Sequence, residues 1–302
     1  MRAWLAPILA CSLLSVGGAA DGIASRRATD DRANCTASPS RVPAGCADLQ
    51  ALARFAAAAY HDQPMAPPSG FLPAKLVGLP LAGGRYTHAA ATALVMTGQI
   101  DRAPVLVVAF GGSEDRATWL ADLRNINAPY RAFRPLIRAI ELYAATGRSV
   151  LLVGHSFGGA IVQLFMFEHL ADDKYRAVTF GSPGALPEDG VFAAQPDARV
   201  TNYVIVDDPY VFLGEHRADV AGHARRNPLY AFALASGIAR ESGLSLAEVV
   251  ATQPYLSANY VNNGARVVLP SHRAGLDVRT VVGADPDEHE IETYAERLGP
   301  VK

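Results

Sequence analysis

A serine in a glycine-rich turn is the first group in this chain whose setting is suited to chemistry. Ser156 stands in the pentapeptide Gly154-His155-Ser156-Phe157-Gly158, with the apolar run 149–153 before it and the helix-like run 160–169 after it. A sharp turn between a strand and a helix exposes a serine hydroxyl. Only small residues on either side of the serine let the neighbouring backbone segments approach closely enough to form such a turn. We therefore predict that Ser156 is a nucleophile, and we expect a structural role for His155.

Strand-like and helix-like runs alternate on both sides of this turn. The β-rich runs are 86–99, 104–110, 175–180 and 200–206, and amphipathic helices are predicted at 47–60 and 130–146. This alternation with short connections predicts a mostly parallel central sheet with helices on both faces. Together with the serine turn, the pattern predicts the α/β-hydrolase fold in one domain, residues 47–302.

A serine hydroxyl needs a base to take its proton and an acid to orient that base. In the predicted fold both follow the serine, the acid first, each on a loop beyond a strand. Asp208 follows the strand 200–206 and is the expected acid, with Asp207 as the alternative. Among the eight histidines, His289 lies in a polar loop after the last predicted strand and is the expected base, with His272 as the alternative.

Backbone donors must also face the oxygen that gains charge during attack by the serine. The first is expected from the N–H of Phe157, directly after the nucleophile. The second is expected from the loop Gly112-Ser113, which follows the strand 104–110, and the Ser113 hydroxyl adds a side-chain donor. Phe157 and Ser113 are therefore the predicted oxyanion hole.

The composition bounds the protein's class and its partners. The chain has 302 residues, of which 50% are hydrophobic and 19% are charged, and its formal net charge is −2. Such a chain can bury a large core, and its charge gives no case for binding nucleic acid. No residues have metal-ligand spacing, and the predicted chemistry needs neither a metal nor an organic cofactor.

The first residues are typical of an exported protein. Residues 1–20 form a predicted signal peptide, with a basic start, an apolar run and a small-residue cleavage site. This predicts a secreted or periplasmic protein, with a lipoprotein anchor on Cys11 as the alternative. Residues 21–46 form a polar segment in which Cys35 and Cys46 are expected to pair as a disulfide. No other stretch looks membrane-spanning.

The second half of the chain carries a long insertion. Residues 214–258 contain helical patches, and their apolar residues fit a pocket wall, a cover or plain core packing. The runs 265–269 and 277–282 are predicted to be a pair of strands. A closing helix is expected to begin near Ile291.

Several of these segments together resemble the class 3, or fungal-type, triacylglycerol lipase family. They are Val107–Ser113 followed by Trp119–Leu123, Gly154–Ala160, Thr179–Pro183, Asn202–Pro209, and Asp287–His289 followed by Tyr294. The resemblance spans residues 47–297. It implies Ser156, Asp208 and His289 as the triad and Ser113 with Phe157 as the oxyanion hole.

The resemblance also implies a lid at 114–119, a short helix that moves at a lipid–water interface, with Trp119 at its border. One residue departs from the family pattern. Gly111 stands where the family usually has an arginine, so the bracing of this loop must differ.

The expected function is therefore that of an exported, lipase-like serine carboxylester hydrolase. It would cleave acyl esters of lipids, or small esters, through an acyl-enzyme intermediate. The alternatives on the same scaffold are a phospholipase A1 and a soluble short-chain esterase. A non-catalytic binding protein with the hydrolase fold is the alternative from another class.

Overall fold

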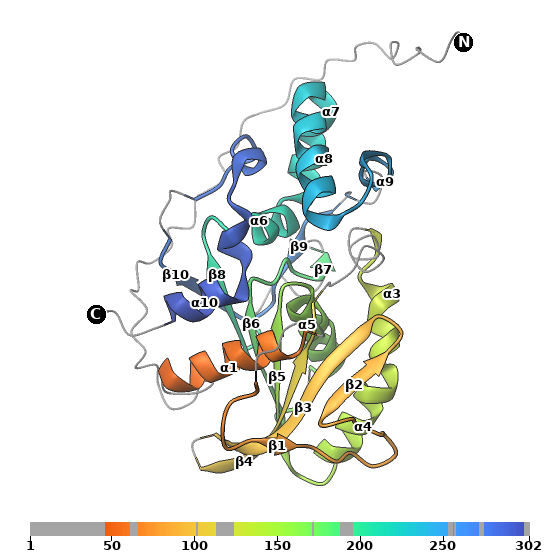
Figure 1. The fold of residues 1–302 in the computed structure, drawn as a ribbon, viewed down its shortest axis with the longest axis vertical. Coiled ribbons are helices and arrows are strands. Elements are labelled where there is room, and N and C mark those ends of the chain that lie inside the picture. The colour runs from red at the N-terminus through yellow and green to blue at the C-terminus, as the bar shows by residue number, and fades with distance from the viewer. Residues whose placement is uncertain are drawn as a thin grey trace. The chain divides into compact units, whose positions relative to one another are not determined.

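An eight-stranded sheet runs through the part of the chain that the structure describes. The computed structural model describes residues 46–60, 66–100, 102–112, 124–170, 172–187, 196–252, 256, 258–271 and 275–298. The strand order is β1-β3-β4-β5-β6-β8-β10, and β2 pairs with β3 (Figure 1). The pairs among β1 to β4 are antiparallel, whereas β4, β5, β6, β8 and β10 run parallel to one another.

The strands of this sheet are β1 Leu72–Pro73, β2 Arg85–His88, β3 Ala91–Ile100, β4 Ala103–Phe110, β5 Ser149–His155, β6 Tyr175–Phe180, β8 Val200–Ile205 and β10 Ala265–Leu269. Two short strands, β7 Leu186–Pro187 and β9 Tyr260–Val261, form a separate antiparallel pair. The helices are α1 Cys46–Ala58, α3 Asn127–Tyr130, α4 Arg134–Ala144, α5 Phe157–Glu168, α6 Pro209–Glu215, α7 Arg217–Arg226, α8 Pro228–Ser242, α9 Leu246–Val250 and α10 Ile291–Arg297. Single 3-10 turns lie at Arg131–Phe133, Val281–Gly283 and Pro286–His289.

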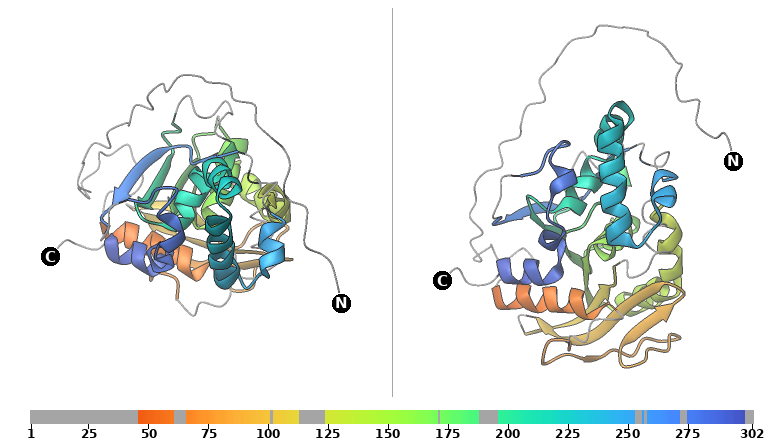
Figure 2. Two further views of the ribbon diagram at one scale, coloured as in Figure 1. Left: turned by 90° about the horizontal axis from the view of Figure 1, so that it is seen from above. Right: turned by 45° about the horizontal axis from the view of Figure 1, so that its top comes forward.

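Helices cover both faces of the sheet, and the pleat of β4 shows how. Leu106, Val108 and Phe110 pack into one buried cluster with residues of α4 and α5. The alternate residues, Val107 and Ala109, pack into a second cluster with α1 and α10, which lie side by side (Figure 2). Because successive strand residues face opposite sides, a strand covered on both faces is apolar throughout.

The predicted fold class is confirmed. A mostly parallel sheet, helices on both faces, and a strand-to-helix turn at the carboxyl end of β5 define an α/β-hydrolase fold. The carboxyl ends of β5, β6 and β8 lie along the same edge of the sheet, since these strands are parallel. Segments that are far apart in sequence therefore meet at this edge.

Two sequence predictions differ from the structure. The run 86–99 is two strands, β2 and β3, joined by a tight turn in which Ala89 has a φ of 51°. The prediction of a strand at 277–282 is wrong. The carboxylate of Asp277 accepts the backbone N–H groups of Arg279 and Thr280 at 2.7 and 2.8 Å, which folds this segment into turns, and β10 instead pairs with β8. A local side-chain hydrogen bond here overrides the β-preference of the valines.

Several predictions fall on residues outside the described ranges. They are the signal peptide 1–20, Cys11, the Cys35–Cys46 disulfide, Ser113, the lid 114–119 with Trp119, and His272. Among the described helices, none is both long and apolar enough to cross a lipid bilayer.

Candidate active site

Ser156 occupies a strained turn at the sheet edge. It lies between β5 and α5 with φ 54° and ψ −129°. Two other described non-glycine residues, Ala89 and Arg102, have positive φ, and both lie in hairpin turns of the sheet. A strained backbone of this kind costs roughly 1–3 kcal/mol and tends to occur at functional sites. Gly158 makes the turn possible, because a Cβ there would lie 2.2 Å from the carbonyl oxygen of Phe110.

Three side chains from distant parts of the chain form a hydrogen-bonded relay at this turn. The Nε2 atom of His289 lies 2.7 Å from the Oγ of Ser156, and its Nδ1 atom lies 2.8 Å from the Oδ2 of Asp208. Because a carboxylate accepts, Nδ1 carries the proton and leaves Nε2 free to accept the serine hydroxyl. This is the arrangement in which an imidazole takes a proton from serine while an aspartate holds its tautomer.

The carboxylate of Asp208 is fully enclosed, with 1% of its surface exposed. Its Oδ1 caps α6 by accepting the N–H groups of Tyr210 and Val211 at 2.8 and 3.1 Å. Its Oδ2 accepts from His289 and from the hydroxyl of Tyr294 at 2.7 Å. These donors replace the water that burial removes, so the carboxylate is held in one orientation.

The two neighbouring aspartates have different partners. Asp207 is also buried, but its carboxylate accepts a hydrogen bond from the hydroxyl of Ser271. Only Asp208 of the two is hydrogen-bonded to His289 within the described residues. Asp208 is therefore the aspartate of this pair that contacts His289. His272 lies outside the described residues.

The imidazole of His289 is packed between two rings. Tyr210 stacks on it with ring centroids 4.1 Å apart, and His155 lies against it at 4.8 Å. The Nε2–H of His155 donates to the backbone oxygen of His289 at 2.7 Å. The Nδ1 of His155 then accepts from the hydroxyl of Tyr60, 2.8 Å away. Burial, with a smaller contribution from His289, holds the pKa of His155 well below its ordinary value, so this ring is neutral.

Tyr294 links Asp208 to the sheet. Its hydroxyl donates to Asp208 and accepts the N–H of Ile205, 3.2 Å away, at the end of β8. Burial, and then the adjacent Asp208, raise the pKa of Tyr294 well above its ordinary value, so it remains a donor. Gly181 leaves room for this contact, because it has a φ of 55° and a Cβ there would lie 3.0 Å from Asp208 Oδ2.

These supporting contacts were missed by sequence reasoning. Tyr294 entered only as part of a family pattern, Tyr60 only as a helix end, and Tyr210 not at all. The one available signal was position, since Tyr294 follows His289 by five residues and Tyr210 follows Asp208 by two. The structure assigns to His155 a structural contact of the kind expected for it.

Phe157 is placed where an oxyanion donor is expected. It is the first residue of α5 and lines the same pocket as Ser156. A residue at the first position of a helix has a backbone N–H that no helical carbonyl can accept. The second predicted donor, Ser113, lies outside the described residues, while its neighbour Gly112 is buried.

The loop at Gly111 lacks the arginine that the fungal-type lipase pattern usually has at this position. A Cβ at this position would lie 2.2 Å from the hydroxyl oxygen of Thr92, so the site has no room for an arginine. Arg85 on β2 instead donates to the carbonyl oxygens of Ala58 and Tyr60 at 2.9 and 3.1 Å. This cation holds the end of α1, and with it the tyrosine that contacts His155.

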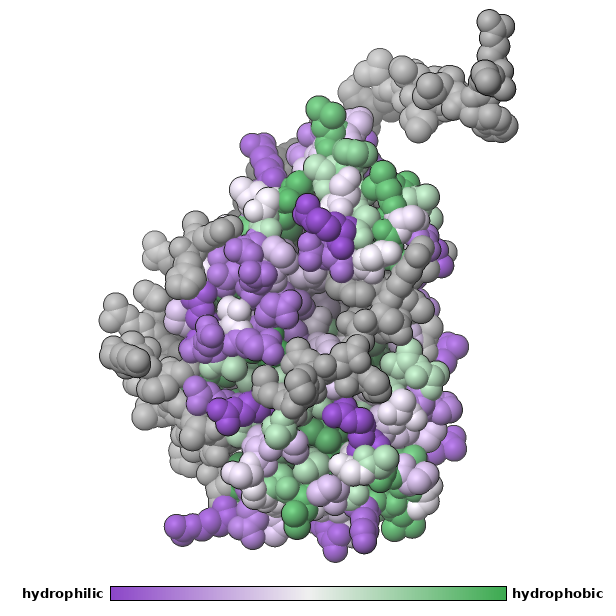
Figure 3. All heavy atoms as spheres, in the orientation of Figure 1, coloured by the Kyte–Doolittle hydropathy of each residue, from purple (hydrophilic) through white to green (hydrophobic). Residues whose placement is uncertain are grey.

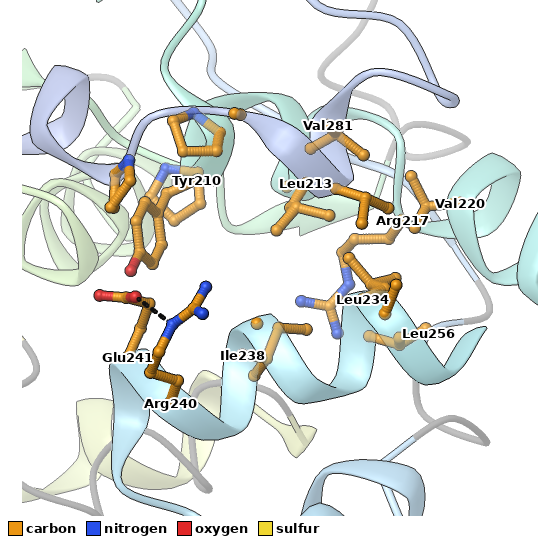
Figure 4. A pocket seen from close by; sticks show the side chains of 18 of the residues that line it. Tyr210, Leu213, Arg217, Val220, Leu234, Ile238, Arg240, Glu241, Leu256 and Val281 are labelled. Carbon is orange, nitrogen blue, oxygen red and sulfur yellow. Dashed lines mark hydrogen bonds and ion pairs between the residues drawn. The ribbon is translucent and has the colours of Figure 1, made fainter. Parts of the chain in front are cut away.

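A pocket of about 180 Å³ opens beside Ser156. Its walls are mostly apolar and come from α6, α7 and α8 and from residues 281–286. Figure 4 shows Leu213 and Val281 on one side, and Leu234 and Ile238 of α8 on the other. The side chains that add polarity are Tyr210, Arg217, Arg240 and Glu241. The insertion therefore forms much of the pocket wall.

Among the described residues, no group of three or more histidine, cysteine, aspartate or glutamate side chains is arranged to hold a metal ion.

Comparisons with known proteins were made for sequence and for structure. No protein-family model matches the chain, and no curated protein matches it. Among solved structures, the chain is similar to the Rhizomucor miehei lipase in complex with its propeptide, at 17% identity and a TM-score of 0.42. This similarity covers 56% of this chain and 63% of that one, so the chain spans less than two thirds of the lipase.

Two further solved structures are similar over comparable lengths. A mutant form of MDLA from Penicillium cyclopium is 14% identical, with a TM-score of 0.36, over 54% of this chain and 72% of that one. The Rhizomucor miehei triacylglyceride lipase is 14% identical, with a TM-score of 0.35, over 55% of this chain and 73% of that one.

Proposed function

We propose that this protein is a serine carboxylester hydrolase that cleaves acyl esters of lipids. The observation that carries the proposal is the relay from Ser156 through His289 to Asp208 at the mouth of an apolar pocket. A nucleophile hydrogen-bonded to a base, which is in turn hydrogen-bonded to an orienting acid, is the arrangement that acyl-transfer chemistry uses. Export, predicted from residues 1–20, remains part of the proposal.

The reaction follows from the atoms of the relay. The Oγ of Ser156 attacks the ester carbonyl carbon while Nε2 of His289 takes its proton. The negative oxygen of the tetrahedral intermediate accepts from the backbone N–H of Phe157. The alcohol leaves with the proton from His289, and an acyl-enzyme remains. Water then attacks the acyl-enzyme in the same way and releases the acid, which restores Ser156.

Hydrolysis of a p-nitrophenyl ester series tests this function. The Ser156→Ala and His289→Ala variants are expected to lose about 10⁴-fold or more in kcat, because removing one member disables the whole relay. A fluorophosphonate probe should label the wild type at Ser156 and leave the Ser156→Ala variant unlabelled. A folded wild type that neither hydrolyses any ester of the series nor reacts with the probe would instead be a non-catalytic binding protein.

A phospholipase A1 activity is the second candidate, and Arg217 favours it. This side chain lines the pocket with 8% of its surface exposed, and its guanidinium lies beside Leu234 and Ile238 (Figure 4). It also stacks 4.2 Å above the ring centroid of Tyr260, and burial lowers its pKa. A buried guanidinium is suited to a substrate that carries an anionic oxygen, such as a lipid phosphate.

Matched lipid substrates separate the two candidates. Phosphatidylglycerol and diacylglycerol with the same acyl chains would be compared for the wild type, Arg217→Lys and Arg217→Met. If Arg217 binds the phosphate, Arg217→Met should lose about tenfold or more in kcat/KM on the phospholipid alone, and Arg217→Lys should lose less. Equal losses on both lipids would assign Arg217 to support of the pocket wall.

A further inference from the structure

The turn between α7 and α8 exposes two large apolar side chains. We call residues 225–232 the α7–α8 tip. Leu229 has 83% and Phe232 has 62% of its surface exposed. They lie on the solvent side of the first turns of α8 and are three residues apart, so they share one face of the helix. Both large apolar side chains therefore face solvent on the same side of α8.

This exposure is not the result of a loosely held helix. Tyr230, between the two residues, is buried in a cluster with Val220, Ala224 and Val281. Its ring also meets the ring of His223 edge-on, with centroids 4.6 Å apart. The helix is therefore anchored while Leu229 and Phe232 take no part in the packing of the described chain.

Apolar side chains also gather on the neighbouring surface. Leu246 and Val250 of α9 are exposed and lie on the helix that packs against α8. Figure 3 shows hydrophobic residues collected over the part of the surface that α7, α8 and α9 form, with hydrophilic residues between them. An exposed apolar patch of this kind marks a surface that contacts a protein or a membrane.

The charge of this surface distinguishes between those two partners. Arg225 and Arg226 are exposed at the end of α7, directly before the apolar pair. No aspartate or glutamate occurs between Val220 and Arg240, although the whole chain has a net charge of −2. Two exposed arginines beside exposed apolar residues complement a surface that is negatively charged outside and apolar within. An anionic lipid layer has this structure.

The same helix also reaches the candidate active site. The opposite side of α8 carries Leu234 and Ile238, which line the pocket beside Ser156. We propose that the α7–α8 tip docks the protein on anionic lipid surfaces, with Leu229 and Phe232 inserted among the acyl chains and Arg225 and Arg226 bound to lipid phosphates. The proposal goes beyond ester hydrolysis, because docking needs no catalytic step.

Vesicle binding tests this docking without hydrolysis. Every protein in the experiment carries Ser156→Ala, which keeps the lipids intact if the proposed function is correct. Vesicle binding can therefore be measured even if the proposed function is wrong. Sedimentation is measured with vesicles of phosphatidylcholine alone and of phosphatidylcholine with phosphatidylglycerol. We expect binding to the anionic vesicles to be about tenfold or more tighter than to the neutral vesicles, and to weaken as salt is added.

Paired variants isolate the two contributions. Leu229→Ser with Phe232→Ser should weaken binding to anionic vesicles by at least about tenfold. Arg225→Gln with Arg226→Gln should remove most of the preference for anionic over neutral vesicles. The control pair is Val77→Ser with Leu142→Ser. These residues are similarly exposed, at 83% and 59%, but lie outside the tip. The control variant should bind vesicles as tightly as the protein with an unaltered tip.

Three outcomes would overturn the docking proposal. One is equal binding to neutral and anionic vesicles, and another is unchanged binding after Leu229→Ser with Phe232→Ser. The third is a dimer in sedimentation velocity that these two substitutions dissociate, because the tip would then contact a second copy of the chain. Hydrolysis of p-nitrophenyl acetate by the tip variants with Ser156 restored should remain at the wild-type rate, which separates a docking defect from a damaged site.

Discussion

His155 donates a hydrogen bond from Nε2 to the backbone oxygen of His289, over 2.7 Å. The residue directly before the proposed nucleophile thus holds the main chain of the proposed base. Because His155 directly precedes Ser156, this bond holds the backbone of His289 beside the turn that carries the Oγ of Ser156. Tyr60 completes this support by donating to the other nitrogen of His155.

Replacing this ring tests the support directly. His155→Phe keeps the ring contact with His289 but removes both hydrogen bonds. We expect kcat on a soluble ester to fall about tenfold, which corresponds to about 1.4 kcal/mol, with KM little changed because His155 does not line the pocket. His155→Gln retains an amide donor and should lose less. Unaltered kcat in His155→Phe would show that this bond does not position His289.

The neutral state of His155 makes stability depend on pH. Its pKa in the fold lies well below the ordinary value of 6.5, because the ring is buried. On acidification below about pH 6.5 the unfolded chain takes up a proton that the folded chain does not, so the free energy of unfolding decreases by up to about 1.4 kcal/mol per pH unit. The contribution is fully present above that pH. Urea unfolding from neutral to mildly acidic pH should show this slope, and His155→Gln should flatten it.

Tyr294 is expected to support both the acid and the fold. Tyr294→Phe removes the hydroxyl that donates to Asp208 and leaves the buried N–H of Ile205 without its acceptor. We expect a loss of about 1–3 kcal/mol in unfolding free energy and a several-fold lower kcat. Denaturant unfolding and ester hydrolysis would be measured on the same sample. Tyr203→Phe is the control, since Tyr203 lies on β8 like Ile205 but makes no described hydrogen bond to Asp208.

The two adjacent aspartates should respond differently to the same substitution. Asp208→Asn takes the acceptor of His289 and should lower kcat by about 10³- to 10⁴-fold, because the imidazole loses its required tautomer. Asp207→Asn keeps an amide oxygen that can accept from Ser271, and Asp207 makes no described contact with His289, so kcat should change by less than about tenfold. The measurement is steady-state hydrolysis of one p-nitrophenyl ester by both variants. The reverse ranking would make Asp207 the acid.

The order of motifs was sufficient to predict a mostly parallel sheet and to place Ser156, Asp208 and His289 at one edge of it. Parallel strands carry their following residues to one edge, so strand order along the chain becomes proximity in space. The distinction between Asp207 and Asp208 was beyond this reasoning. It depends on the orientation of the Asp208 side chain, in which one carboxylate oxygen caps α6 and the other faces His289.

Other features depended on packing that no local pattern records. The contact of Tyr60 with His155 requires α1 to pack over the sheet, and that of Tyr294 with Asp208 requires α10 beside it. The error at 277–282 had a local cause, since the turn made by Asp277 outweighs two valines with high β-propensity. The tip at Leu229 could not be predicted either, because an apolar helix residue usually faces the core.

Part of the pocket wall comes from a length of chain that carries none of the three side chains of the relay. Ser156, Asp208 and His289 are held by β5, β8 and the turn before α10, whereas α7 and α8 lie between Asp208 and His289 in sequence. Residues 217–250 thus shape the pocket without supplying any of the three side chains of the relay. Under the proposed function, substitutions within residues 217–250 would change which esters the pocket accepts and leave the three relay residues in place.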